Sequence, residues 1–179
     1  MIQAVFERIT KCGLTDWAVL LKGVCGVPSL SGKLPTSCVE DFASAELEKV
    51  AGNNPLLDVI VSLANDSDLP LSELCPQLKK MSDFQNAEVQ RAKRIWRAFA
   101  LEELLANLDS DPLYGLIKLS EFWSGWDWPA DAPLSMIPGA MTLPQNQYHS
   151  ASNYDHVVHE HEQWLKDELV ALSCRKALT

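Results

Sequence analysis

A chain of 179 residues, 47% hydrophobic and 22% charged, is long enough to bury a sizeable core, and its composition excludes wholesale disorder. Its formal net charge of −9 argues against a general DNA- or RNA-binding protein, because such a protein needs a basic face to neutralise phosphates. The same charge suits a basic protein partner. No apolar stretch reaches the ~18 residues that a membrane span needs, so no membrane association is expected.

The start of the chain and its cysteines favour a cytoplasmic protein. Residues 1–8 lack the basic flank and long apolar core of a secretory signal. The five cysteines are an odd number and include no CxxC pair. We therefore expect buried, reduced thiols, as in a bacterial cytosol, and interpret the 13-residue recurrence of Cys12, Cys25 and Cys38 as chance.

The first half of the chain has apolar residues at helical spacing almost throughout. A first helix is expected from Ile2 until Gly13 ends it. Asp16, together with Thr15, is expected to cap a second helix, which Gly23 and Gly26 end. Further helices are expected over about 37–51, 55–65 and 71–81, the last interrupted by Pro76.

The second half begins with the longest predicted helical segment, from Asp83 to Leu108. Asp111 is then expected to cap a helix that has Pro112 at its first position. This helix leads into a tryptophan-rich run. Residues 125–152 are rich in Pro, Gly, Ser and Asn and should be mostly irregular. Ser152 or Asn153 is expected to cap a final helix that runs to about Ser173.

These elements predict an all-α protein with seven or eight helices and no convincing strand. Short turns between successive helices favour stacked antiparallel pairs, as in a compact bundle or a short α-solenoid. No repeat of fixed period is visible, which favours the bundle. We expect a single helical domain over residues 1–179, with the irregular segment at about 125–152.

Acidic residues concentrate in two regions. Residues 40–73 hold eight acids against one base, and residues 102–131 hold seven against one. Each region is either an ordinary solvated face or a face offered to a cationic partner. The candidates for partner binding in and beside these regions are Glu40, Asp41, Glu46, Glu48, Asp109, Asp111, Trp126, Asp127, Trp128 and Asp131.

All four histidines lie in the last 31 residues. On a helix, His156, His159 and Glu160 could face one cation, which makes them weak candidates for a metal site. Their spacing differs from the HExxH pattern of zinc hydrolases. The alternative is a solvated helix start that is rich in histidine, so we predict no cofactor and no catalytic residue.

The tryptophans divide into two groups. Trp17, Trp96 and Trp164 lie on apolar helical faces and are expected in the core, as is Trp123 at the end of its helix. Trp126 and Trp128 are expected in an extended piece, because Pro129 disfavours helical backbone at the preceding residue. These two either pack against a corner of the bundle or serve as exposed anchors for a partner.

The run Trp123-Ser124-Gly125-Trp126-Asp127-Trp128-Pro129, followed by Met136-Ile137-Pro138, resembles a signature of a bacterial family of unknown function, number 2247 in the domain-of-unknown-function series. Leu14-Thr15-Asp16-Trp17 is similar to an early segment of the same family. The family signature more usually has tyrosine at the position where this chain has Trp128. The resemblance implies a small helical cytosolic protein, of a kind often encoded beside bacterial toxins and suspected to be immunity-protein-like. It supplies no active-site residues.

The leading hypothesis is a non-catalytic immunity protein that binds and neutralises a cognate toxin through an acidic face. A toxin that acts on nucleic acid or nucleotides has a basic active-site cleft, and charge complementarity would speed its capture. One alternative is a metal-binding protein or metal-dependent enzyme that uses His156, His159 and Glu160. Another is a helical adaptor or scaffold. Direct binding of nucleic acid is not expected.

Overall fold

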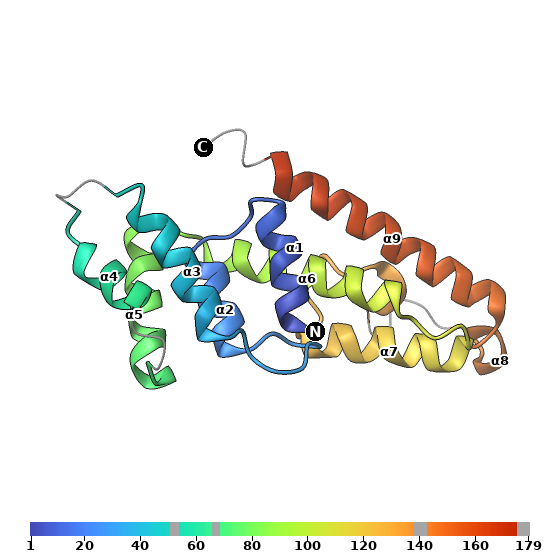
Figure 1. The fold of residues 1–179 in the computed structure, drawn as a ribbon. Coiled ribbons are helices and arrows are strands. Elements are labelled where there is room, and N and C mark those ends of the chain that lie inside the picture. The colour runs from blue at the N-terminus through green and yellow to red at the C-terminus, as the bar shows by residue number, and fades with distance from the viewer. Residues whose placement is uncertain (51–53, 66–68, 138–142, 175–179) are drawn as a thin grey trace. The chain divides into compact units, whose positions relative to one another are not determined.

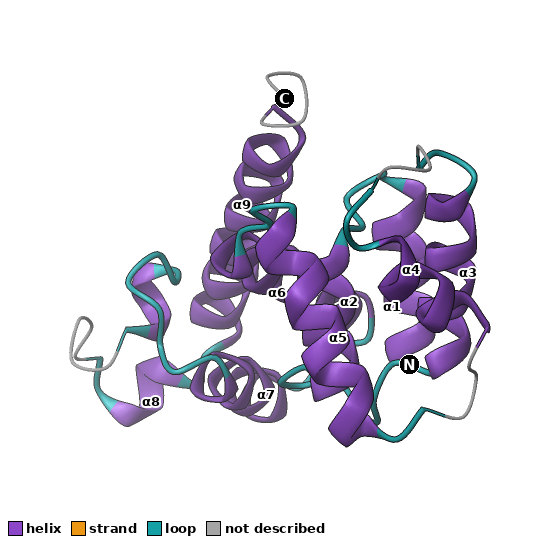
Figure 2. Ribbon diagram, turned by 90° about the vertical axis from the view of Figure 1, so that its left-hand side faces the viewer, coloured by secondary structure: helices purple, strands orange, loops and turns teal. Residues whose placement is uncertain are grey.

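The structure, a computed structural model, describes residues 1–50, 54–65, 69–137 and 143–174. In these ranges the chain forms eight α-helices of nine residues or more, the four-residue helix α8 and one 3-10 helix, and no strand (Figures 1 and 2). The all-α class is confirmed. The helices fall into two compact units, Met1–Trp96 and Arg97–Thr179, each described by itself below. The expected single domain stays a prediction.

Unit 1 contains α1 (Ile2–Lys11), α2 (Trp17–Cys25), α3 (Thr36–Leu47), α4 (Leu57–Asn65), α5 (Leu71–Phe84) and the first turns of α6 (Val89–Ala106). Helix α3 packs on α4, and α2 packs on α5. The predicted cap of α2 is confirmed, because the Asp16 carboxylate accepts a hydrogen bond from the Val19 N–H at 2.8 Å. Helix α3 ends at Leu47, before the expected end at about residue 51, which itself lies outside the described residues.

Trp96 is the centre of the unit 1 core. Its side chain is fully buried, its ring stacks on Phe6 at 6.2 Å, and its Nε1–H donates to the Val19 carbonyl at 2.8 Å. Gly23 lets α2 approach this indole, since a Cβ at that position would lie 2.7 Å from the ring. Trp17 is buried and its ring meets the Phe42 ring edge to face, so the expected core positions of both tryptophans are confirmed.

The long helical segment predicted from Asp83 to Leu108 is wrong in one respect, because it contains a break. Helix α5 ends at Phe84 and α6 begins at Val89. Between them Asn86 adopts a left-handed conformation with φ of 51°. Asparagine tolerates this conformation better than most residues, so it ends a helix much as glycine does.

Unit 2 contains the rest of α6, α7 (Pro112–Gly125), the 3-10 helix η1 (Leu134–Met136), α8 (Gln145–Tyr148) and α9 (Ala151–Cys174). Helices α7 and α9 contact each other, and both begin at the same end of unit 2 (Figure 1). They run in the same direction, because Gly115 near the start of α7 meets Tyr154, and Trp123 near its end meets His161. The expected packing of helices in pairs is therefore present, but this pair is parallel rather than antiparallel.

The helix starts of unit 2 follow side-chain caps. The Asp111 carboxylate accepts from the backbone N–H groups of Leu113 and Tyr114 at 2.9 and 3.3 Å, and Pro112 follows it, as predicted. Helix α9 begins slightly earlier than expected, since Ser150 Oγ accepts from the Asn153 N–H at 3.2 Å. Among the described residues, no helix has the length and apolar character that crossing a membrane requires.

Candidate functional site

The tryptophan run contributes to a partly buried cluster in unit 2, which we call the indole cluster: Trp123, Trp164, His161, Arg97 and Asp131. Trp123 and His161 are fully buried, and Trp123 donates its Nε1–H to His161 Nε2 at 2.7 Å. The edge of one indole meets the face of the other at 5.2 Å between ring centroids. The expected burial of Trp123 is confirmed, whereas Trp164 is only partly buried.

Charge in the indole cluster is compensated internally. The Arg97 guanidinium lies over the Trp123 and Trp164 rings at 5.8 and 5.1 Å, and it forms an ion pair with Asp131. The Asp131 carbonyl also accepts from Trp164 Nε1. Asp131 was a candidate for partner binding, but it holds the buried Arg97. Its side chain is nevertheless 51% exposed, so a role in partner binding stays a prediction.

The extended backbone predicted for Trp126 and Trp128 is wrong. Helix α7 ends at Gly125, and the Asp127 and Trp128 N–H groups turn back to the Ser124 and Trp123 carbonyls, each at 3.1 Å. This pair of bonds is a Schellman motif, with Asp127 at the position that glycine usually takes. Asp127 and Trp128 both have positive φ, at 58° and 46°. The turn keeps both of its tryptophans half-buried and leaves Asp127 exposed.

A hollow of about 410 Å³ lies where the turn after α6 meets the first turns of α9; we call it the acidic groove. Asp109, Asp155 and Glu162 supply its carboxylates, and His159 adds an imidazole. Its lining is completed by Leu105, Leu108, Ser110, Tyr154 and Val158. The groove therefore combines negative charge with an aliphatic wall, which is the chemistry that recognises the stem and head of a lysine or arginine side chain.

Tyr154 fixes the geometry of the acidic groove. Its hydroxyl donates to the Asp109 carbonyl, and its ring lies against Gly115, where a Cβ would be 2.5 Å from the ring. Burial raises the pKa of Tyr154, and the negative charges of Asp109, Asp155 and, to a smaller extent, Asp111 raise it further. Tyr154 thereby links the turn before α7 to the start of α9.

The predicted acidic candidates divide among three places. Asp109 lines the acidic groove, and its carboxylate accepts from the Asp111 N–H at 2.9 Å, so both belong to the turn before α7. The group from Trp126 to Asp131 lies at the other end of α7, about 20 Å away by helix length. The remaining candidates, on and just after α3 in unit 1, are Glu40, Asp41, Glu46 and Glu48.

The candidates associated with α3 have differing surroundings. Glu40 is half-buried, and its Oε1 is enclosed without a hydrogen-bond partner in the described structure. Glu46 pairs with Lys49 at 2.8 Å. Asp41 is exposed on the rim of an apolar hollow of about 460 Å³ between α1 and α3, and Glu48 is exposed at the end of α3. Only Asp41 and Glu48 are thus presented openly to a partner.

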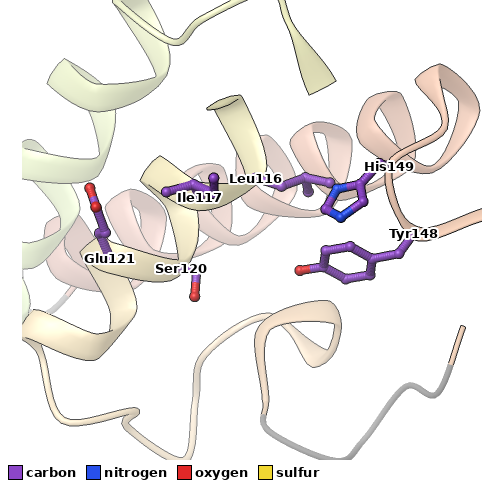
Figure 3. A pocket seen from close by; sticks show the side chains of 6 residues that line it. All are labelled: Leu116, Ile117, Ser120, Glu121, Tyr148 and His149. Carbon is purple, nitrogen blue, oxygen red and sulfur yellow. The ribbon is translucent and has the colours of Figure 1, made fainter. Parts of the chain in front are cut away.

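A second hollow in unit 2, of about 190 Å³, is lined by Leu116, Ile117, Ser120, Glu121, Tyr148 and His149. Figure 3 shows the α7 residues along one side and the Tyr148 and His149 rings on the other. The two rings meet edge to face at 5.0 Å. Glu121 forms an ion pair with Lys118 at 3.0 Å, so this hollow carries less uncompensated negative charge than the acidic groove.

The candidate metal ligands on α9 are oriented toward different partners. His156 Nε2 lies 3.8 Å from Glu160 Oε1, whereas His159 Nδ1 lies 3.8 Å from Glu162 Oε2. In the described part of the chain, no group of three or more His, Cys, Asp or Glu residues is arranged to hold a metal ion. His159 and Glu162 belong instead to the acidic groove.

Sequence reasoning missed Asp155, Glu162 and His161. Asp155, His159 and Glu162 are spaced by four and three residues, which places them on one helical face, and this spacing could have revealed the groove wall. His161 belongs to a different, buried face with Tyr154. In the sequence, only its position on the same helical face as Tyr154 distinguishes His161 from its exposed neighbours.

The described residues thus form a small all-α protein with an acidic groove in its second unit. The chain belongs to a family described as uncharacterized protein conserved in bacteria (DUF2247), whose model matches residues 6–169. The resemblance carried by the tryptophan run is thereby confirmed, and the acidic groove and the indole cluster lie within the matched range. No curated protein and no solved structure matches the chain.

Proposed function

We propose that the protein is a non-catalytic immunity protein that acts in the bacterial cytoplasm and neutralises a cognate toxin through its acidic groove. The observation that carries the proposal is the convergence of Asp109, Asp155 and Glu162 around an aliphatic wall. A lysine or arginine side chain of the toxin would place its charged head among the carboxylates and its stem on Leu105 and Leu108.

The charge of the whole chain supports this choice of partner. A formal net charge of −9 attracts a protein with a basic cleft and accelerates the encounter. Glu162 and Asp155 are exposed, so their carboxylates are accessible to a partner without rearrangement of α9. In the indole cluster, by contrast, Arg97 already neutralises Asp131.

The test is co-expression with the protein encoded by the adjacent reading frame, followed by affinity measurement with the purified pair. The wild-type chain should co-purify with that protein and relieve its toxicity. The double variant D155N/E162Q should weaken binding about 30-fold, which corresponds to ~1 kcal/mol for each carboxylate removed. Circular dichroism of this variant checks that α9 is intact.

The matched control is D41N/E48Q, which removes the same number of charges from exposed residues of unit 1. It should change the affinity less than about threefold, because it leaves the acidic groove intact. A larger loss of affinity in D41N/E48Q than in D155N/E162Q would indicate that the toxin binds at α3 instead of at the acidic groove. Failure of the wild-type chain to bind or protect would refute the immunity proposal, and capture of a non-toxic partner instead would favour the adaptor.

A further inference from the structure

Two cysteines of unit 1 lie in contact although they are 50 residues apart in sequence. Cys25 Sγ and Cys75 Sγ are separated by 3.6 Å, and both thiols are free. The expectation of buried thiols is wrong for the described cysteines, because Cys25 is exposed and Cys75 is half-buried. The other two described cysteines, Cys12 and Cys38, are also free.

The helices that carry the pair hold it in place. Cys25 is the last residue of α2 and Cys75 lies in the second turn of α5, and these two helices pack on each other. A disulfide bond requires the sulfur atoms to approach by about 1.5 Å from their present separation. Rotation of the side chains can supply part of this movement. Gly26, with φ of 105°, follows Cys25 and allows its backbone to adjust.

The environment gives the two thiols different roles. Cys25 is exposed, so a dissolved reagent reaches it first. Burial raises the pKa of Cys75, and the hydrogen bond with Cys25 raises it further, whereas Lys33 opposes the shift. Cys75 is therefore the less accessible thiol of the pair, and it stays protonated beside Cys25.

We propose that Cys25 and Cys75 are a modification site that forms a reversible disulfide by exchange with a low-molecular-weight disulfide such as oxidised glutathione. The Cys25 thiolate attacks one sulfur of the reagent, forms a mixed disulfide and releases one glutathione thiolate. Cys75 then loses its proton to solvent and attacks Cys25 Sγ, which releases the second glutathione. Two protein thiols are oxidised to one disulfide, and one oxidised glutathione is reduced to two thiols.

The disulfide would fasten α2 to α5 and close a loop that contains α3 and α4. A cross-link across this many residues restricts the unfolded chain, so the oxidised protein should be more stable than the reduced one. We expect the melting temperature to rise by about 10 °C on oxidation. Binding at the acidic groove is not part of this inference, which therefore stands apart from the proposed function.

The experiment uses the reduced full-length chain with millimolar oxidised glutathione, followed by peptide mapping without reductant. We expect a peptide pair linked through Cys25 and Cys75, in a protein two hydrogen atoms lighter, and we expect reductant to reverse the link. The rate should increase with pH, because the pKa of Cys75 is raised. A protein that stops at glutathione on Cys25, or that links other cysteines instead, would overturn the proposal.

Serine variants separate the two steps. C75S should accumulate glutathione on Cys25, because the second thiol is missing, and C25S should form no cross-link. The control C12S removes another exposed thiol and should form the Cys25–Cys75 link at the wild-type rate. Cross-linking that depends on Cys12, or that persists in C25S, would contradict the assignment. The wild-type peptide map decides the question even if a variant folds poorly.

Discussion

At the scale of single residues, His161 is held in one protonation state by its neighbours. Trp123 Nε1–H can only donate, so His161 Nε2 must accept without a proton, and Nδ1–H then donates to the Val157 carbonyl at 2.7 Å. Burial lowers the pKa of His161 below the ordinary value of about 6.5, although Val157 and Glu160 oppose the shift. The folded chain therefore binds this proton less readily than the unfolded chain does.

The neutral His161 predicts a loss of stability in mild acid. Its contribution is complete above about pH 6.5 and declines as the pH falls toward the lowered folded-state pKa, by up to ~1.4 kcal/mol per pH unit. Urea unfolding of the wild type and of H161Q at several pH values measures this. The difference between their unfolding free energies should shrink as the pH falls below 6.5.

Exposed histidines on the same helix provide the comparison. His156 and His159 have side chains that are 59% and 78% exposed, so removing them should leave the pH profile almost unchanged. If H156Q/H159Q flattens the profile as much as H161Q does, the buried imidazole is not its source.

Gly115 is a residue whose role depends on the close approach of the Tyr154 side chain. It lies inside α7, where alanine would normally favour the helix by about 1 kcal/mol. Here a Cβ would meet the Tyr154 ring and hydroxyl at about 2.5 Å, so we expect G115A to destabilise the protein by ~1–2 kcal/mol. Denaturant unfolding measures the change.

A double-mutant cycle identifies the cause of that loss. In a Y154L background the obstructing ring is gone, so G115A should become neutral or stabilising. The same destabilisation in both backgrounds would mean that the ring of Tyr154 is not what excludes a side chain at Gly115.

At the scale of helices, the Asp111 side chain stabilises the start of α7. Its carboxylate caps α7, so D111A should reduce the unfolding free energy by ~1 kcal/mol, whereas D111N keeps a capping oxygen and should lose much less. Thermal or urea unfolding of both variants checks this. Equal losses would show that the charge of Asp111, rather than its cap, stabilises the helix start.

Local signals account for most of the element boundaries. The caps at Asp16 and Asp111 follow from side chains that bond to neighbouring N–H groups, and both are confirmed. The break at Asn86 and the turn at Asp127 were missed, because each places a residue other than glycine in a left-handed conformation. Such a conformation is stabilised by the surrounding packing, which the local sequence does not reveal.

The candidate site was less accessible to sequence reasoning than the fold. Asp109 was identified from acidic composition, but its partners Asp155 and Glu162 lie on α9 and meet it only through tertiary packing. The parallel arrangement of α7 and α9 depends on the segment at 126–150, whose length says nothing about its path. Asp131 is exposed in the structure, as its sequence context suggested, but its ion pair with the buried Arg97 could not be predicted.

At the scale of the whole molecule, charge sets the rate at which a basic partner is captured. Long-range attraction from a net charge of −9 is screened within about 8 Å at physiological salt, so the association rate constant should fall about tenfold between roughly 25 and 250 mM salt. The dissociation rate should change much less, because short-range contacts determine it. Stopped-flow mixing with the proposed toxin measures both rates.

The two charge-matched variants show whether the attraction comes from the net charge of the whole chain or from the carboxylates of the acidic groove. D155N/E162Q and D41N/E48Q change the net charge equally, so steering by net charge alone would lower the salt dependence of association equally in both. We expect a smaller salt dependence and faster dissociation only in D155N/E162Q, because its carboxylates surround the groove that receives the basic side chain. Equal effects on association with no change in dissociation would mean that charge attracts the partner and another surface binds it.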